Sequence, residues 1–150
     1  MTHTIGSVTA GDPYKIRIVA RNRLGPSPAS SETTIYAAAV PSEPNAPTRV
    51  ANSFAQTTID IEWTPSSNGG STITGYEVWW NGGGSGPVTG LKLTINDAST
   101  TAQITGLAPG TYYKFAIKAL NIVGSSGLSG ETLLIAATVP AKPTAITLVS

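Results

Sequence analysis

Residues 107–121 read LAPGTYYKFAIKALN, and their side chains alternate in polarity over the longest such stretch in the chain. One predicted face carries Tyr113, Phe115, Ile117, Ala119 and Asn121. The opposite face carries Lys114, Ala116, Lys118 and Leu120. A period of two residues is typical of a β-strand with one face in a hydrophobic core. The stretch therefore predicts a long strand whose first set of side chains points inward and whose second set points outward.

The region around this strand occurs twice in the chain. Residues 110–140 align without a gap with residues 11–41, at an offset of 99 positions, and 15 of the 31 aligned residues are identical. A fixed period is the signature of an array in which each copy is one structural unit. A unit of this size can bury a core of its own. The chain is therefore predicted to be a window on a longer tandem array.

Shorter alternating runs surround the long strand. They predict strands at 58–63, 73–80, 91–95, 101–105 and 131–138. Segments rich in Gly, Pro, Ser and Asn separate these runs and predict turns, and no segment has a sustained helical period. About seven strands in one unit predict an all-β antiparallel sandwich. Its predicted core consists of Ile59, Ile61, Trp63, Tyr76, Val78, Leu107, Tyr113, Phe115, Ile117 and Ala119.

The composition argues against several classes of protein. The formal net charge is +1, so there is no bulk electrostatic reason to expect nucleic acid or an anionic membrane surface as a partner. No apolar run approaches the ~20 residues of a membrane-spanning helix, so no membrane insertion is expected within this segment. The chain has no cysteine, which excludes disulfides and thiolate metal sites but leaves the cellular compartment open.

Reactive groups are too scarce to predict a catalytic, metal or cofactor site. The only histidine is His3, so a Ser-His-Asp arrangement has no support. The glycine-rich stretch 81–86 lacks the Lys-Ser/Thr pair of a phosphate-binding loop. Asp60 and Glu62 share a predicted outward face and could act as an acid and a base, although solvated strand charges have the same pattern. The sequence therefore predicts that this segment is not an enzyme and binds no cofactor.

The second unit also carries a set of short motifs. They are Pro44-Asn45-Ala46-Pro47, Trp63, NGGSTITGY at 68–76, LAPGTYYKF at 107–115 and ALNIVGSS at 119–126. Together these motifs resemble the fibronectin type III domain family over residues 44–138. The resemblance implies an immunoglobulin-like antiparallel β-sandwich of the fibronectin type III type, arranged in tandem. In such a fold Trp63 and Tyr76 come from different sheets and meet in the core.

Two polar side chains have expected roles in this fold. The Tyr113 hydroxyl is expected to bond to the backbone near Leu107, which is the arrangement of a tyrosine corner. Asn121 ends the long strand before a turn that contains Gly124, where its side-chain amide can satisfy loop backbone.

The resemblance divides the chain into three parts. Residues 1–40 resemble the C-terminal part of one repeat, residues 41–139 a complete repeat, and residues 140–150 the first strand of a following repeat. Closely spaced prolines in the junction at 37–47, and again at 136–143, favour extended and stiff backbone. The junctions therefore predict a semi-rigid rod.

The first part should be structurally incomplete. It lacks the strands that correspond to residues 57–95, so we expect Tyr14, Ile16 and Ile18 to be uncovered and one sheet edge to be unpaired. We expect neighbouring chain from the same array, or other copies in a filament, to cover these side chains and the unpaired edge.

One candidate partner site lies on the complete repeat. Trp79 is predicted to point away from the core, beside Lys114 and Lys118. An exposed indole could anchor a protein partner or stack on a sugar. The lysine stems could instead simply shield the ring.

A second candidate site lies on the first part of the chain. Lys15, Arg17 and Arg21 alternate on one predicted strand face. Such a basic stripe could hold an acidic glycan, but an ordinary solvated strand face has the same pattern.

The leading functional hypothesis is a non-catalytic structural or adhesive segment of a tandem array. It would act as a semi-rigid spacer or filament component that contacts neighbouring repeats or other proteins, outside the cell or at its surface. The alternative is an accessory spacer module of a large secreted carbohydrate-active enzyme. An intracellular array of the sarcomeric type is a third possibility. No Arg-Gly-Asp triplet is present, so the family's best-known integrin-binding loop cannot be transferred to this chain.

Overall fold

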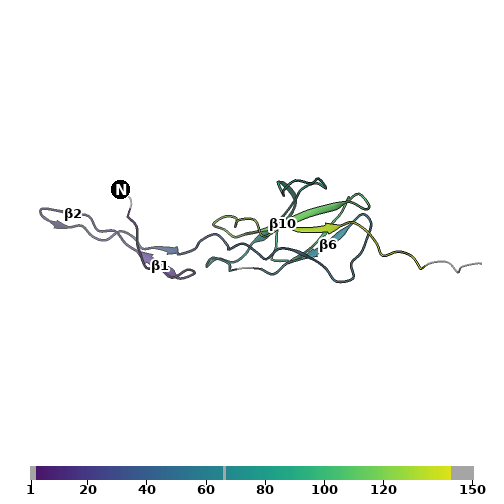
Figure 1. The fold of residues 1–150 in the computed structure, drawn as a ribbon. Helices are drawn as coiled ribbons and strands as arrows, with labels where there is room; N and C mark the ends of the chain where they lie inside the picture. Colours follow the sequence, from purple (N-terminus) through teal and green to yellow (C-terminus); the bar gives the residue numbers. More distant parts are fainter. Residues whose placement is uncertain (1–2, 66, 143–150) are drawn as a thin grey trace, which may run out of the picture.

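The computed structural model describes residues 3–65 and 67–142, and every regular element in these ranges is a β-strand. The predicted opening strand of a following repeat lies almost entirely at 143–150, outside the described residues. Figure 1 shows an elongated molecule, with an N-terminal hairpin extending from one end of a compact sandwich and the C-terminal segment leaving the other end.

The sandwich consists of two antiparallel sheets (Figure 1). One sheet has the order β5 (Thr48–Arg49), β6 (Ile59–Glu62) and β9 (Thr101–Ile104). The other has the order β11 (Thr132–Ile135), β10 (Tyr112–Leu120), β7 (Gly75–Trp80) and β8 (Gly90–Ile95). The prediction of an all-β sandwich with about seven strands is therefore confirmed.

Four predicted strands are longer than the observed ones, and the largest differences are at 131–138 and 73–80. The alternation at 131–138 continues past Ile135, but Ala136 pairs there with the turn before β10: its N–H donates to Thr111 and its carbonyl accepts from Gly110. At 73–80 the strand begins only at Gly75. Past Ile135 the alternation therefore extends into a segment that is held by turn backbone, whereas just before β7 the Thr74 N–H donates to the Leu120 carbonyl of β10.

All ten predicted core residues are buried, and Ile104 and Ala136 join them. Trp63 and Tyr76 approach edge to face across the two sheets, with ring centroids 5.3 Å apart. Ala116 is an exception to the predicted pattern, because it is fully buried although it lies on the outward face. In the register of β10 with β7 it stands opposite Trp79, whose larger side chain shares that face. A small side chain beside a large one loses its solvent exposure even on an outer face.

The two expected polar roles are confirmed. The Ala108 N–H donates to the Tyr113 hydroxyl oxygen over 2.8 Å, which closes a tyrosine corner. The Asn121 Oδ1 accepts hydrogen bonds from the N–H groups of Val123 (2.8 Å) and Gly124 (3.1 Å). An unpaired buried polar group costs about 1–3 kcal/mol, so these hydrogen bonds help to stabilise the two turns.

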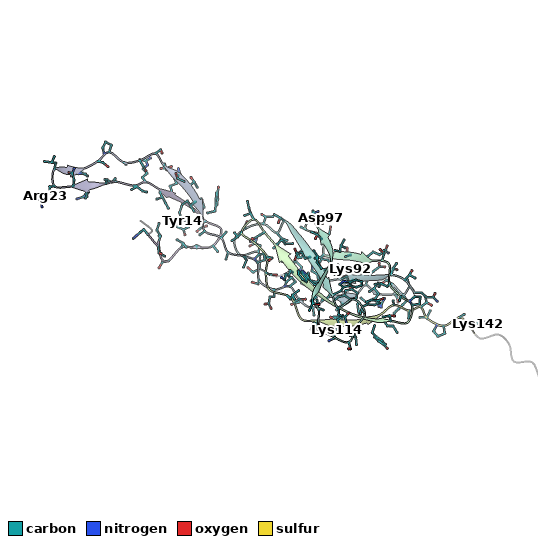
Figure 2. All side chains as sticks on the ribbon, turned by 90° about the horizontal axis from the view of Figure 1, so that it is seen from above. Tyr14, Arg23, Lys92, Asp97, Lys114 and Lys142 are labelled. Carbon is teal, nitrogen blue, oxygen red and sulfur yellow. The ribbon has the colours of Figure 1, made fainter. Side chains whose placement is uncertain are left out.

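The N-terminal hairpin contains four short strands. They are β1 (Pro13–Ile16), β2 (Arg21–Asn22), β3 (Gly25–Pro26) and β4 (Thr33–Tyr36). β1 pairs with β4, and β2 pairs with β3, both antiparallel. Figure 2 shows Arg23 at the far tip of this hairpin and Tyr14 near the sandwich.

The hairpin carries an apolar face with incomplete cover. Ile18 is 72% exposed, whereas Ile117 at the corresponding position of the sandwich is fully buried. Tyr14 and Ile16 are only half-exposed. The prediction that they would be uncovered therefore overestimated their exposure to solvent. They line a shallow depression that is shared with Ile5 and other apolar side chains of the same segment. The hairpin thus shields part of its own face, but its core positions remain open to solvent.

Candidate functional site

The Trp79 site lies on the outer face of the four-stranded sheet. Trp79 is half-buried on β7, and its indole N–H donates to the Glu77 carboxylate over 2.8 Å. The Lys118 ammonium stands 4.7 Å from the centre of the indole ring. This is cation–π distance, and it places a positive charge over one face of the ring. The structure therefore brings Lys118 and Trp79 together, and the lysine covers part of the surface that a partner would use.

Lys114 is engaged with a different residue. Its Nζ lies 3.2 Å from Glu131 Oε2, and the other oxygen of Glu131 accepts a hydrogen bond from the Val88 N–H over 2.9 Å. Figure 2 places Lys114 on the body of the sandwich. Glu131 thus ties the β7–β8 connection to the β10–β11 pair. The Val88 hydrogen bond, followed by the bond to Lys114, lowers the pKa of Glu131 below its ordinary value.

This lowered pKa predicts a pH dependence of stability. Glu131 is ionised more readily in the folded chain, so its stabilising effect is fully present above the ordinary pKa of 4.5. The effect disappears as the pH falls through the folded-state pKa. Glu131→Gln keeps an oxygen for Val88 but has no charge, so its free energy of unfolding should fall less steeply than that of the wild type below pH 5 or so.

Urea titrations of both proteins between neutral and acidic pH measure this difference. All other acids are shared, so they cancel in the comparison. Parallel pH profiles for the two proteins would show that Glu131 gains nothing from Val88 and Lys114.

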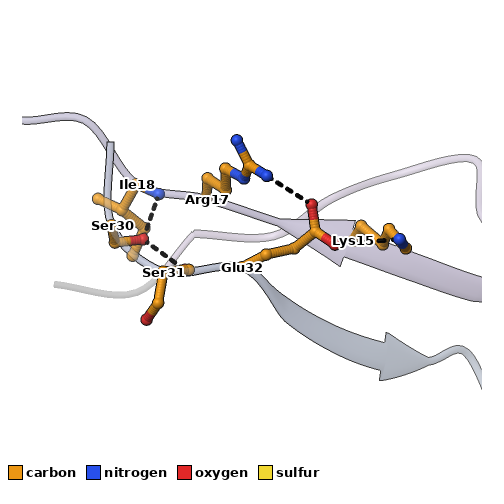
Figure 3. A network of polar contacts seen from close by, with 6 residues as sticks. All are labelled: Lys15, Arg17, Ile18, Ser30, Ser31 and Glu32. Atoms are coloured by element: carbon orange, nitrogen blue, oxygen red, sulfur yellow. Dashed lines mark hydrogen bonds and ion pairs between the residues drawn. The ribbon is translucent and has the colours of Figure 1, made fainter. Parts of the chain in front are cut away.

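The basic stripe of the N-terminal hairpin is partly neutralised. Glu32 lies between two of its members, 3.1 Å from Lys15 Nζ and 3.0 Å from Arg17 Nη2, as Figure 3 shows. Arg21 lies further along, on the exposed β2. One carboxylate balances two cations, so an acidic ligand would have to compete with Glu32. Exposed pairs of this kind are individually worth ~0–1 kcal/mol.

Acidic side chains do not gather into a metal site in the described ranges, where no group of three or more potential ligands occurs. Asp60 and Glu62 stand opposite Gln103 and Thr101 in the strand register. Asp97 accepts a hydrogen bond from the Ser99 N–H over 2.8 Å, and contacts with Ser99 lower its pKa. The Asp97 carboxylate is therefore held by its own turn, whereas the buried Oδ1 of Asp60 has no hydrogen-bond partner among the described residues. Within 3–65 and 67–142 there is also no helix that could cross a bilayer.

A third site joins the hairpin to the sandwich, and the sequence did not reveal it. The Asn121 Nδ2 donates to the carbonyl oxygens of Ala39 (2.8 Å) and Asn68 (3.0 Å). The Ala39 N–H donates to the Gly69 carbonyl over 2.8 Å. Gly70 lies directly against Gly11 at the base of the hairpin. Asn121 was expected to cap its own loop, but no local pattern could indicate two partners that lie 82 and 53 positions away in the sequence.

The prolines of the junction are part of the sandwich. Pro41, Pro44 and Pro47 are all buried, and the Ser42 and Asn45 N–H groups donate to carbonyls of the β6–β7 loop. They therefore do not form a free spacer between two bodies. The segment between the hairpin and the sandwich therefore ends before Pro41, since Ala39 is already bonded to the sandwich.

Comparison with known proteins agrees with this architecture. Residues 45–133 match the protein family described as "Fibronectin type III domain". Chitinase A1 of Niallia circulans is 40% identical over 131 residues, which cover 83% of this chain and 17% of the chitinase. Contactin-3 of Homo sapiens is 32% identical over 128 residues, which cover 82% of this chain and 12% of contactin-3.

A solved structure supports the same assignment. A crystal structure of titin domains superposes with a TM-score of 0.64 at 25% sequence identity, over 86% of this chain and 42% of that chain. The chain spans less than a fifth of the length of the two curated relatives. On the matched residues, the two-sheet sandwich and the tyrosine corner, the chain belongs to the fibronectin type III domain family.

Proposed function

We propose that this chain is a non-catalytic segment of a tandem fibronectin type III array, acting as a semi-rigid spacer with structural or adhesive contacts. The observation that carries the proposal is that the hairpin and the sandwich share one hydrogen-bonding scheme at an offset of 99 residues. The Thr9 N–H donates to the Tyr14 hydroxyl oxygen over 2.7 Å, as the Ala108 N–H does to Tyr113 over 2.8 Å.

Serine side chains follow the same offset. The Ile18 N–H donates to Ser30 Oγ over 3.0 Å, and the Ser30 hydroxyl donates to the Ser31 carbonyl over 2.9 Å (Figure 3). In the sandwich, the Ile117 N–H and Ser129 make the equivalent pair, at 2.9 Å. Specific side-chain to backbone bonds of this kind depend on the local fold, so their recurrence supports a second repeat of the same type.

The extent of the similarities supports the tandem proposal. The match to Chitinase A1 runs over 131 residues, whereas the match to the fibronectin type III domain family covers only residues 45–133. The titin match covers 86% of this chain, which is more than the sandwich alone. Both similarities therefore include sequence from the hairpin side of the junction.

An accessory spacer of a large secreted carbohydrate-active enzyme is the alternative function, and the similarity to a chitinase favours it. Both functions place the chain outside the cell or at its surface, where an insoluble polysaccharide or an adhesive partner is found. Contacts with neighbouring repeats, with other proteins through Trp79 and Lys118, or with an acidic glycan through Lys15, Arg17 and Arg21 are part of this proposal.

Two measurements test the proposal. Small-angle scattering of the chain extended upstream to a full preceding repeat should show an elongated particle that lengthens by one domain. A compact particle would contradict the spacer function. The 150-residue chain should show no hydrolysis of chitin or β-glucan. Hydrolysis that disappears in Asp60→Asn or Glu62→Gln would overturn the non-catalytic assignment, and a hydrolase domain in the parent sequence would favour the accessory function.

A further inference from the structure

We propose that Asn121 and the loop Asn68–Gly70 form a clamp that fixes the preceding repeat against the sandwich. In this arrangement the clamp, and not the stiffness of the prolines, sets the angle between the two units. The partner of the clamp is the C-terminal segment of a preceding copy of the same repeat, so the inference rests on the proposed tandem function.

The Asn121 side chain is fully used in the clamp. Its Oδ1 accepts two hydrogen bonds from its own loop, and its Nδ2 donates two, to Ala39 and Asn68. It is 6% exposed. A buried amide with both donors and the acceptor satisfied holds three segments in one geometry: the β10–β11 loop, the β6–β7 loop and the junction.

The junction between the two units narrows to one residue. The Ala37 N–H and carbonyl are bonded to Asp12 and Gly11 of the hairpin. The Ala39 N–H and carbonyl are bonded to Gly69 and Asn121 of the sandwich. Only Ala38 lies between a residue held by one unit and a residue held by the other. A connection of one residue between two bonded ends leaves little freedom of rotation.

Two glycines allow the backbones to approach. A Cβ at Gly69 would strike the carbonyl oxygens of Ala39 and Val40, and a Cβ at Gly70 would lie 2.5 Å from the Gly11 nitrogen. Both glycines also have positive φ, at 67° and 84°. Glycine is thus required here for the close contact as well as for the backbone conformation.

The hairpin contains a natural comparison for Asn121. Asn22 stands 99 positions earlier, and its Oδ1 accepts from the Leu24 N–H (2.8 Å) and the Gly25 N–H (3.2 Å). Its Nδ2 has no partner within the described ranges, and Asn22 is exposed. The loop-capping half of the role is therefore local, whereas the two donor bonds depend on a junction segment lying beside the amide.

Asn121→Asp separates the loop-capping role of the side chain from its two donor bonds. The carboxylate can still accept from Val123 and Gly124, but at neutral pH it cannot donate to Ala39 or Asn68. The chain has no cysteine, so spin labels can be attached uniquely to Thr34→Cys on β4 and Thr94→Cys on β8, which are both exposed. In the otherwise wild-type chain we expect one narrow distribution of label distances, and in Asn121→Asp a broad one. Asn22→Asp is the matched control and should leave the distribution narrow.

A glycine pair tests the contact independently. Gly70→Ala should displace the hairpin and broaden the distance distribution, because its Cβ meets backbone atoms of Ala10 and Gly11. Gly110→Ala has a similar positive φ of 73° but no atom within 4 Å of the added Cβ. It carries the same backbone strain without the contact and should leave the distribution unchanged.

Hydrogen exchange gives a second measurement on the same proteins. The Ala39 N–H donates to the Gly69 carbonyl, so the Ala39 amide should exchange about tenfold faster in Asn121→Asp and Gly70→Ala, because both changes loosen the junction against this loop. The amides of Ile59 and Phe115 in the core report that the sandwich is still folded. Unchanged exchange at Ala39 in both variants would overturn the clamp.

The proline explanation predicts the opposite result. If Pro41→Ala broadens the distance distribution while Asn121→Asp leaves it narrow, proline stiffness sets the angle and the clamp does not. A broad distribution in the otherwise wild-type chain would also overturn the clamp, yet it would leave the tandem array intact. The array itself fails only if the parent sequence lacks the rest of a repeat before the hairpin.

Discussion

Trp63→Ala should lower the free energy of unfolding of the sandwich by about 3–5 kcal/mol, the usual cost of removing a large aromatic side chain from a core. Trp63 is 6% exposed and packs edge to face on Tyr76, which belongs to the opposite sheet. Its removal leaves a cavity between the sheets and also removes an aromatic contact that is worth ~0.5–1.5 kcal/mol beyond the buried area. Because a small domain is stable by only about 5–15 kcal/mol, this loss is a large fraction of its total stability.

Urea unfolding followed by circular dichroism measures this effect, since tryptophan fluorescence changes with the substitution itself. Leu133→Ala is the matched control, because Leu133 is 57% exposed on β11. Its cost should stay within about 0.5 kcal/mol, as for most surface substitutions. A loss for Trp63→Ala as small as that of Leu133→Ala would mean that the two sheets are not held together at this contact.

Gly75→Ala should destabilise the sandwich by about 1–3 kcal/mol, although it adds only one methyl group. Gly75 begins β7 and is buried, and an added Cβ would lie closer than 3.0 Å to the carbonyl oxygen of Ile95 on β8. Backbone on the neighbouring strand cannot move aside as the end of a flexible side chain can. The two strands must therefore separate at this point, which weakens the pairing of Tyr76 with Ile95.

Gly90→Ala is the control for this change and should have the opposite sign. Gly90 lies on the paired strand β8, but its added Cβ would approach no atom closer than the Trp80 side chain at 3.4 Å. Replacing a strand glycine without a clash removes freedom from the unfolded chain, so a gain of about 0.5–1 kcal/mol is expected. Thermal unfolding of the two variants tests both signs at once. Equal changes in the midpoint would show that the contact with Ile95 has no energetic weight.

Local patterns in the sequence predicted most of the core. The alternation through Tyr113, Phe115 and Ile117 predicted one buried face of β10, and the structure confirms it. The same rule placed Ala116 outside, yet Ala116 is fully buried there, opposite the larger Trp79 in the strand register. A period of two says which way a side chain points. It does not say how large the side chains on adjacent strands are.

These patterns could not predict contacts between segments that lie far apart in the sequence. The donor bonds of Asn121 and the bond of Glu131 to Val88 join loops whose approach depends on the whole sandwich. The hairpin also shows that local sequence patterns do not determine burial. Its sequence is similar to that of β10 and β11 and makes the same local hydrogen bonds, yet Ile18 is 72% exposed because no second sheet covers it.

The one-residue connection at Ala38 also has a consequence for length scales far above that of one domain. The segment AAAVP at 37–41 recurs as AATVP at 136–140, so a following repeat in the proposed array would be joined through nearly the same sequence. An array with identical joints turns by the same angle at every step and therefore winds as a screw. In the proposed array, the pitch of this screw would fix how often the Trp79 face returns to the same side. A partner with several sites at that spacing would bind with the advantage of multivalency, whereas a single site would gain nothing.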